Sequence, residues 1–274
     1  MARSSPPEPP ELFTRSGWVT CRPRSGGVTC WPGGRDSLTA VLLLAIDTST
    51  TAITVALHDG HAVVAEQTTL DARAHAEHLA PNIHSALAQA GAGPSDVTGV
   101  VVGIGPGPFT GLRVGIVSGR TFALALGVPV HGLCSLDALA HEAWLGGHRG
   151  RLLAATDARR KEVYAAEFLL DDRGLTRVAG PVVGRAADLD EKWRALPVAG
   201  RGPRLYPADL GRSADDGSGP SGIRPLPLDV SAGALADLAT RRLATGDELD
   251  GLEPLYLRRP DVASAPPTRK STLG

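Results

Sequence analysis

Aromatic residues, cysteine and methionine are all scarce in this chain. Phe, Trp and Tyr make up 4% of its 274 residues, so the core is expected to consist of Ala, Val and Leu. The three cysteines, Cys21, Cys30 and Cys134, are an odd number without the spacing of a disulfide framework. That pattern favours a reducing compartment, with Cys134 as a buried structural thiol.

Long apolar runs and an excess of positive charge are also missing. No run approaches the ~18 residues of a membrane span, and the first 40 residues contain no apolar segment of a secretory signal. We therefore expect a cytoplasmic protein without membrane contact. The formal net charge of −1 excludes the basic footprint of a stand-alone nucleic-acid binder, so work on RNA would require a partner that holds the RNA.

The two ends of the chain differ in composition from its middle. Residues 1–40 are rich in Pro, Gly, Ser and Arg without any helix or strand period, which predicts a disordered extension. The pattern changes at "VLLLAIDTST", and one hypothesis is that translation starts near Val41. A docking tail carrying Trp18 and Trp31 is the alternative. Residues 261–274 are expected to form a second disordered tail.

Residues 41–150 and 151–260 look like two similar halves. The first predicts three strands ("VLLLAID", "AITVALHDG", "HAVVAEQTT"), a helix over 75–91, a strand over 96–105 and a helix over 110–127. The stretch "RLLAATDARRKEVYAAEFLLDDRG" repeats the layout of the first hairpin, with Asp47 and Asp157 at matching strand ends. A tandem pair of βββαβα units is the α/β architecture of actin, Hsp70 and sugar kinases (the ASKHA fold), which bind ligand between the halves.

The stretch "GIGPGPFTGLRVG", from Gly103 to Gly115, predicts a strand, a tight loop and a helix. Such loops often bind phosphate, yet this one lacks both the P-loop Lys and the dinucleotide fingerprint. Thr110 is expected to cap the helix, which is apolar nearly all round and so expected to be buried. Small residues recur every four positions along one side of it: Gly111, Gly115, Gly119, Ala123 and Gly127.

That small-residue stripe requires a close neighbour, because glycine inside a helix costs roughly 1 kcal/mol relative to alanine. The helix could pack tightly on its own sheet. Alternatively, it could pack against the equivalent helix of a partner subunit. The sequence leaves both readings open.

Four stretches, "AIDTSTTAITVAL", "GPGPFTGLRVG", "DARRKEVYAAEF" and "PLYLRRP", resemble the TsaB (YeaZ) family over Leu42 to Pro260. Pro108 stands where that family usually has a small polar residue. The resemblance implies a non-catalytic subunit that pairs with the related catalytic subunit TsaD. With the ATPase TsaE, they transfer a threonylcarbamoyl group to a tRNA adenosine beside the anticodon, the tRNA being reached through the complex.

The resemblance favours a partner interface on the two helices of the first half. The residues assigned to it are His78, Leu79, Asn82, Ile83, Ala86, Gly111, Leu112, Arg113, Gly115 and Gly119. Arg113 is expected to be its exposed polar group. Whether the free chain is a monomer or a homodimer stays open.

The sequence lacks most motifs that carry catalysis, cofactor binding or metal binding. We therefore expect no catalytic residue, no cofactor and no metal site. The helix histidines lack a histidine partner four residues later. Asp47, Thr48 and Ser49 keep one phosphate-type turn and predict a weak nucleotide contact, whereas Arg159 and Arg160 replace glycine in the second turn and should obstruct it. A small-molecule kinase or ATPase of the same fold is the alternative function.

Overall fold

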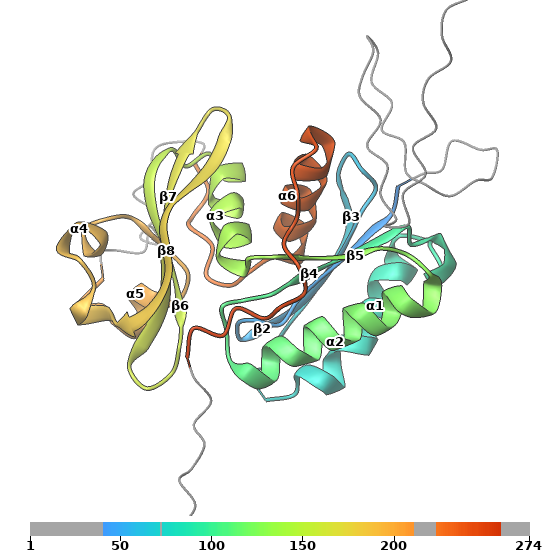
Figure 1. Ribbon diagram of the computed structural model, residues 1–274, viewed down its shortest axis with the longest axis horizontal. Helices are drawn as coiled ribbons and strands as arrows, with labels where there is room; N and C mark the ends of the chain where they lie inside the picture. Colours follow the sequence, from blue (N-terminus) through green and yellow to red (C-terminus); the bar gives the residue numbers. More distant parts are fainter. Residues whose placement is uncertain (1–40, 72, 211–222, 259–274) are drawn as a thin grey trace, which may run out of the picture.

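The computed structural model describes residues 41–71, 73–210 and 223–258. The extension predicted over 1–40, the tail predicted over 261–274 and the segment 211–222 lie outside these ranges. The described residues form two sheets with helices between and outside them (Figure 1).

The first sheet has the order β3-β2-β1-β4-β5. Its strands are β1 (Leu43–Asp47), β2 (Ala52–His58), β3 (Val63–Leu70), β4 (Gly99–Gly103) and β5 (Val130–Leu133). The second sheet has the order β8-β7-β6-β9. It contains β6 (Gly150–Asp157), β7 (Glu162–Asp171), β8 (Gly174–Arg185) and the short β9 (Val198–Ala199).

The two sheets repeat one topology, as the sequence predicts. In each, a first strand pairs antiparallel with the next strand of the chain and parallel with a later one: β1 with β2 and β4, and β6 with β7 and β9. The α/β fold with tandem units of the ASKHA type is therefore confirmed. The division at residues 150 and 151 stays a prediction, because the last helix, α6 (Ala232–Thr245), contacts β1, β2 and β3 of the first sheet.

The helices form layers on the sheets (Figure 1). α1 (His75–Gln89) and α2 (Phe109–Leu126) cover one face of the first sheet, while α3 (Ser135–Leu145) and α6 lie between the two sheets. The short helices α4 (Glu191–Arg194) and α5 (Gly202–Leu205) flank the second sheet, and η1 (Pro94–Asp96) and η2 (Ala186–Asp188) are single turns. The core on both sides of the first sheet is mostly Ala, Val and Leu.

Neither α2 nor α3 begins with a side-chain cap, although the sequence predicts Thr110 as the cap of α2. The residue before α2 is Pro108, and Thr110 lies inside the first turn without acting as a cap. The residue before α3 is Cys134, and the Ser135 hydroxyl donates to the Asp47 carboxylate instead of capping the helix. The start of α6 is capped by Ser231, whose Oγ accepts from the Ala234 amide at 3.0 Å.

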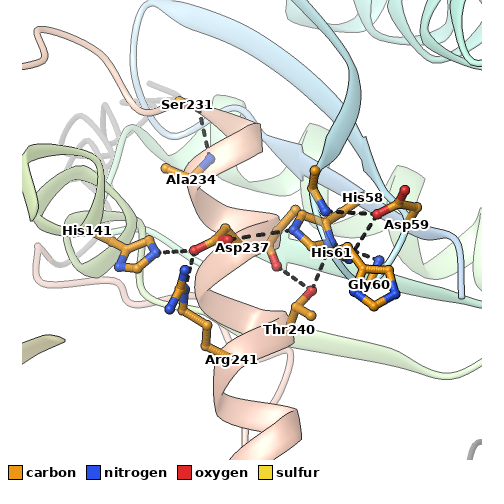
Figure 2. A network of polar contacts seen from close by, with 12 residues as sticks. His58, Asp59, Gly60, His61, His141, Ser231, Ala234, Asp237, Thr240 and Arg241 are labelled. Atoms are coloured by element: carbon orange, nitrogen blue, oxygen red, sulfur yellow. Dashed lines mark hydrogen bonds and ion pairs between the residues drawn. The ribbon is translucent and has the colours of Figure 1, made fainter. Parts of the chain in front are cut away.

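A partly buried carboxylate fixes α6 to its neighbours (Figure 2). Asp237 Oδ2 accepts from His141 Nε2 of α3 at 2.7 Å and from Arg241 Nε at 2.5 Å. Its Oδ1 lies 3.7 Å from His58 Nε2 of β2. Burial acts to raise the pKa of Asp237, but the hydrogen bonds from His141, His58 and Arg241 outweigh burial and hold that pKa well below its usual range.

Candidate functional site

Asp47 lies at the carboxyl end of β1 and is fully buried. Its Oδ1 accepts from the Ser49 amide at 2.8 Å and the Ser49 hydroxyl at 2.7 Å, and its Oδ2 accepts from Ser135 Oγ at 2.5 Å. Burial raises the pKa of Asp47, and the hydrogen bonds from Ser135 and Ser49 act in the opposite direction. A Cβ at Gly103, the last residue of β4, would overlap the Asp47 carboxylate. The Asp47 side chain therefore ties β1, β4 and α3 together.

The small-residue stripe of α2 faces the same strand end. Thr48 Oγ1 donates to the Gly111 carbonyl at 2.7 Å, and a Cβ at Gly111 would lie 2.6 Å from the Thr48 carbonyl oxygen. A Cβ at Gly115 would overlap the Thr48 side chain, and one at Gly119 would overlap Val102 of β4. The stripe is thus the surface by which α2 packs on its own sheet.

This packing corrects most of the expected partner interface. Gly111, Gly115 and Gly119 are buried inside the chain, so their assignment to a subunit interface is wrong. The same holds for Leu79, Ala86 and Leu112, which are buried in the core between the first sheet and its outer helices.

Asn82 and Ile83 are half-buried and mostly serve the chain itself. The Asn82 amide donates to the Ile53 carbonyl at 3.1 Å and accepts from the Thr69 hydroxyl at 3.2 Å, while Ile83 packs on the core. His78 keeps an accessible side chain, and Arg113 is exposed as expected. Of the ten assigned residues, Arg113 is exposed and His78 keeps 41% of its side chain accessible, so these two remain available to an incoming partner.

The cleft between the halves, where a nucleotide was expected to touch Asp47, Thr48 and Ser49, is almost closed. Its cavity of about 20 Å³ has room for about one water, and is lined by Ser49, Thr50, Thr51, Pro108, Thr156, Asp157, Arg159, Arg201 and Asp229. Asp47 and Thr48 are 0% and 1% exposed and use their polar atoms within the chain, so their assignment as nucleotide contacts is corrected. A contact at Ser49 stays a prediction.

The turn that faces this cleft from the second half has an unusual backbone. Arg159, Arg160 and Lys161 have φ values of 64°, 53° and 63°, the left-handed region that favours glycine. Each such residue costs about 1–2 kcal/mol. Arg159 and Arg160, the side chains expected to obstruct a phosphate, thus occupy glycine-like conformations together with Lys161, and all three are exposed.

The outer face of α2 is open and apolar. Phe109, Val117 and Leu124 are 46%, 55% and 80% exposed, on the side of the helix opposite the glycine stripe. A groove of about 460 Å³ runs along this face and is lined by Ala76, Phe109, Thr110, Arg113, Val114, Val117 and Ser118. Sequence reasoning missed this face because it treated the helix as buried all round. The available signal was the spacing of Phe109, Val117 and Leu124, eight and seven positions, or about two helical turns each.

Other expected features can be placed as well. Cys134 is a buried thiol, as predicted, and burial raises its pKa to about 12. Within residues 41–71, 73–210 and 223–258, no three His, Cys, Asp or Glu side chains are grouped so that they could hold a metal ion. None of the helices in these ranges is both long enough and apolar enough to span a membrane.

Comparison with known proteins identifies the family. The sequence model of TsaD, described as tRNA N6-adenosine threonylcarbamoyltransferase, matches residues 62–202. The tRNA threonylcarbamoyladenosine biosynthesis protein TsaB of Escherichia coli is 33% identical over 79% of this chain and 94% of its own length. An uncharacterized Mycobacterium tuberculosis protein is 45% identical over 80% of this chain and 93% of its own.

Solved structures agree with these sequence matches. A Pseudomonas aeruginosa protein described as similar to the peptidase YeaZ superposes with a TM-score of 0.64 at 32% identity, over 80% of this chain and all of its own. YeaZ from the same organism gives a TM-score of 0.62 at 31% identity, over 75% and 93% of the two chains. The sequence motifs, the tandem fold and these matches agree, and the chain belongs to the TsaB (YeaZ) family.

Proposed function

We propose that this chain is a non-catalytic subunit that pairs with a TsaD-type catalytic subunit in the biosynthesis of threonylcarbamoyladenosine in tRNA. The pairing surface is the open face of α1 and α2, named here the pairing face: Ala76, His78, Phe109, Arg113, Val117 and Leu124. In the proposed complex, a TsaE-type ATPase works beside the two subunits, which transfer the threonylcarbamoyl group to an adenosine next to the anticodon. The proposed location is the cytoplasm.

The exposed apolar side chains of α2 are the observation that carries this proposal. A contiguous apolar surface rimmed by polar groups is typical of a protein interface. Leu124 is 80% and Val117 55% exposed, so both would lose contact with water on binding. The groove lined by Val117 has a volume of about 460 Å³, enough room for side chains of a partner helix. A second copy of this chain could occupy the same face when the catalytic subunit is absent, so pairing with TsaD would compete with a homodimer.

The kinase or ATPase alternative fits the cleft poorly. Small-molecule sites usually measure about 300–1,000 Å³, whereas the cavity between the two turns is about 20 Å³. The carboxylate at the end of β1, which a kinase of this fold would need for metal or phosphate chemistry, is bound to Ser49 and Ser135.

The pairing face can be tested with one charge in its apolar part. We expect Leu124→Glu to keep the monomer folded, because the side chain is in solvent, and to weaken binding of the catalytic subunit at least tenfold. A buried unpaired charge in an interface costs several kcal/mol, more than the roughly 1.4 kcal/mol that corresponds to a tenfold change in Kd. Affinity is measured by calorimetry, and modification by a reconstituted tRNA assay.

Leu205→Glu is the matched control. Leu205 is 46% exposed on α5, on the far side of the second sheet, and the substitution makes the same change in charge. It should leave pairing and modification unchanged. Equal binding by the wild type and the Leu124→Glu variant would contradict the pairing face, and modification by this chain without any catalytic subunit would contradict its non-catalytic role.

A further inference from the structure

Three segments that are distant in the sequence meet at one end of the molecule. They are the loop and first turn of α2 (107–113), the β6–β7 turn (157–162) and residues 256–258, which follow the last helix. Tyr164 Oη donates to the Gly107 carbonyl at 3.4 Å, and Pro108 and Arg159 line the same small cavity. All three segments lie along the lower edge of the view in Figure 1.

This end, named here the basic tip, carries a local excess of positive charge. The three segments contain five cations, Arg113, Arg159, Arg160, Lys161 and Arg258, against two acids, Asp157 and Glu162. Each acid already has an ion pair, with Arg159 at 3.1 Å and with Arg258. Five cations less two acids give these three segments a formal charge of +3, although the whole chain has a formal net charge of −1.

Aromatic rings lie beside these charges. The rings of Phe109 and Tyr256 stack with centroids 5.1 Å apart, and the Arg113 guanidinium lies 5.1 Å from the Phe109 centroid. Tyr256 is 41% exposed, a large fraction for a Tyr whose segment is fixed by the hydrogen bond from the Leu255 amide to the Ile104 carbonyl. Cationic side chains around an exposed aromatic ring are the combination that binds single-stranded nucleic acid.

The backbone of the β6–β7 turn adds a further sign. Its three left-handed residues, Arg159, Arg160 and Lys161, are strained in a way that clusters at functional sites. The turn keeps its cations exposed at this conformational cost. A glycine in the same conformation would remove the strain together with the charge.

We propose that the basic tip binds the tRNA substrate directly, with Arg160 and Lys161 on backbone phosphates and Tyr256 stacked on an unpaired base. This inference rests on the proposed role in tRNA modification and adds an RNA contact made by this chain itself. A neutral chain binds RNA weakly alone, so the tip supplements the contacts of the catalytic subunit. The excess of positive charge favours a polyanion over a protein at this end. The tip shares Phe109 and Arg113 with the pairing face, whereas Val117 and Leu124 lie further along α2.

The test removes two charges from the tip of the full-length chain. Binding of a fluorescein-labelled unmodified tRNA transcript to the mixture with the catalytic subunit is followed by fluorescence anisotropy across a range of salt concentrations. We expect Arg160→Gln with Lys161→Gln to weaken the tRNA Kd at least tenfold at 0.1 M salt. The slope of log K against log salt should fall by about 1.4–1.8, since each lost phosphate contact removes about 0.7–0.9. Pairing of the subunits without RNA, measured by size exclusion, should be unchanged.

Arg173→Gln with Lys192→Gln is the matched control. Arg173 lies in the β7–β8 turn, at the opposite end of the second sheet, and both residues are exposed. These substitutions also remove two positive charges, but away from the tip. The slope of log K against log salt for tRNA binding should therefore keep its wild-type value. In a second arm, Tyr256→Ala should weaken binding at least fivefold, whereas Tyr256→Phe should retain it.

Several results would overturn the inference. If the Arg160 and Lys161 double variant binds tRNA with the wild-type Kd and the wild-type salt dependence, the inference is wrong. The pairing proposal would then still stand. Loss of the catalytic subunit by that variant would make the tip a protein-docking surface. If the wild type itself fails to pair, the proposed function is wrong, and the same variants then decide the RNA contact on this chain alone.

Discussion

Buried carboxylates connect the elements of this chain more than aromatic packing does. Asp137 of α3 accepts from Arg177 of β8 at 2.8 Å and from Arg242 of α6 at 2.9 Å. Asp47 and Asp237 link α3 to β1 and to α6 in the same way. A core of small aliphatic side chains gives little directional information, whereas a buried charge must be matched by specific donors. These carboxylates therefore set the relative placement of α3 and α6.

We predict that Asp237→Asn lowers the free energy of unfolding by about 2 kcal/mol at pH 7, the range for hydrogen bonds to a charged group. The folded-state pKa of Asp237 is depressed, so its contribution is present above the unfolded value of about 4. The contribution is lost as the pH falls from there toward the folded pKa. Urea unfolding of both proteins at pH 7 and below pH 4 measures the difference.

Asp172→Asn is the control for this prediction. Its side chain is fully exposed and pairs with Arg149 at the surface, where an ion pair contributes little. It should change the unfolding midpoint only slightly at either pH. If the difference in the free energy of unfolding between wild type and Asp237→Asn stays constant with pH, packing and not the charge accounts for the effect.

At the scale of one element, α2 carries two opposite surfaces. Its small side contacts β1 and β4 so closely that a Cβ at Gly119 overlaps Val102. Its outer side holds Phe109, Val117 and Leu124 in solvent. The same helix therefore needs glycine for its own fold and apolar side chains for the proposed partner. This explains why its sequence is apolar nearly all round.

Gly119→Leu should consequently destabilise the monomer. The new side chain enters a filled contact with β4, and overpacking of this kind costs about 1–3 kcal/mol or more. Circular dichroism melting should give a lower midpoint for the chain alone. Ala125→Leu, at an exposed position on the same helix, adds a similar side chain and should melt like the wild type. A stable Gly119→Leu variant that cannot pair would mean that the stripe contacts a partner instead.

Element boundaries could be predicted where the signal is local. As expected, one strand ends at the Asp59-Gly60 turn, and two helices end before Gly91 and Gly127. All three glycines have positive φ. The cap predicted at Thr110 is wrong. The role of Ser135 could not be predicted, since its hydroxyl donates to a carboxylate 88 positions earlier in the chain. The neighbour of the glycine stripe could not be predicted either. Sequence periodicity shows which side of the helix carries small residues, but not which element packs against that side.

At the scale of the whole molecule, contacts between distant segments surround the cleft, and one of them joins the two predicted halves. Tyr164 of the second sheet bonds the Gly107 carbonyl, and Arg258 at the end of the C-terminal segment pairs with Glu162 of β7. Arg201 holds Asp229 with two bonds of 2.8 and 2.6 Å at the cavity wall. The tandem sequence predicted a cleft between halves, but its width depends on these long-range pairs, which no local pattern reveals.

A closed cleft predicts that the isolated chain binds ATP more weakly than ~0.1 mM. Admitting a nucleotide into a cavity of about 20 Å³ requires the halves to separate, and the apparent affinity falls with the fraction of open molecules. At 1 mM Mg-ATP, binding should therefore stabilise the folded state by no more than about 1.4 kcal/mol. The thermal unfolding midpoint should rise only by the amount that corresponds to this stabilisation. Inorganic triphosphate at matched ionic strength controls for non-specific charge effects on the basic tip. A micromolar Kd from calorimetry, which would stabilise the fold by about 4 kcal/mol at that concentration, would contradict the closed cleft and restore the kinase alternative.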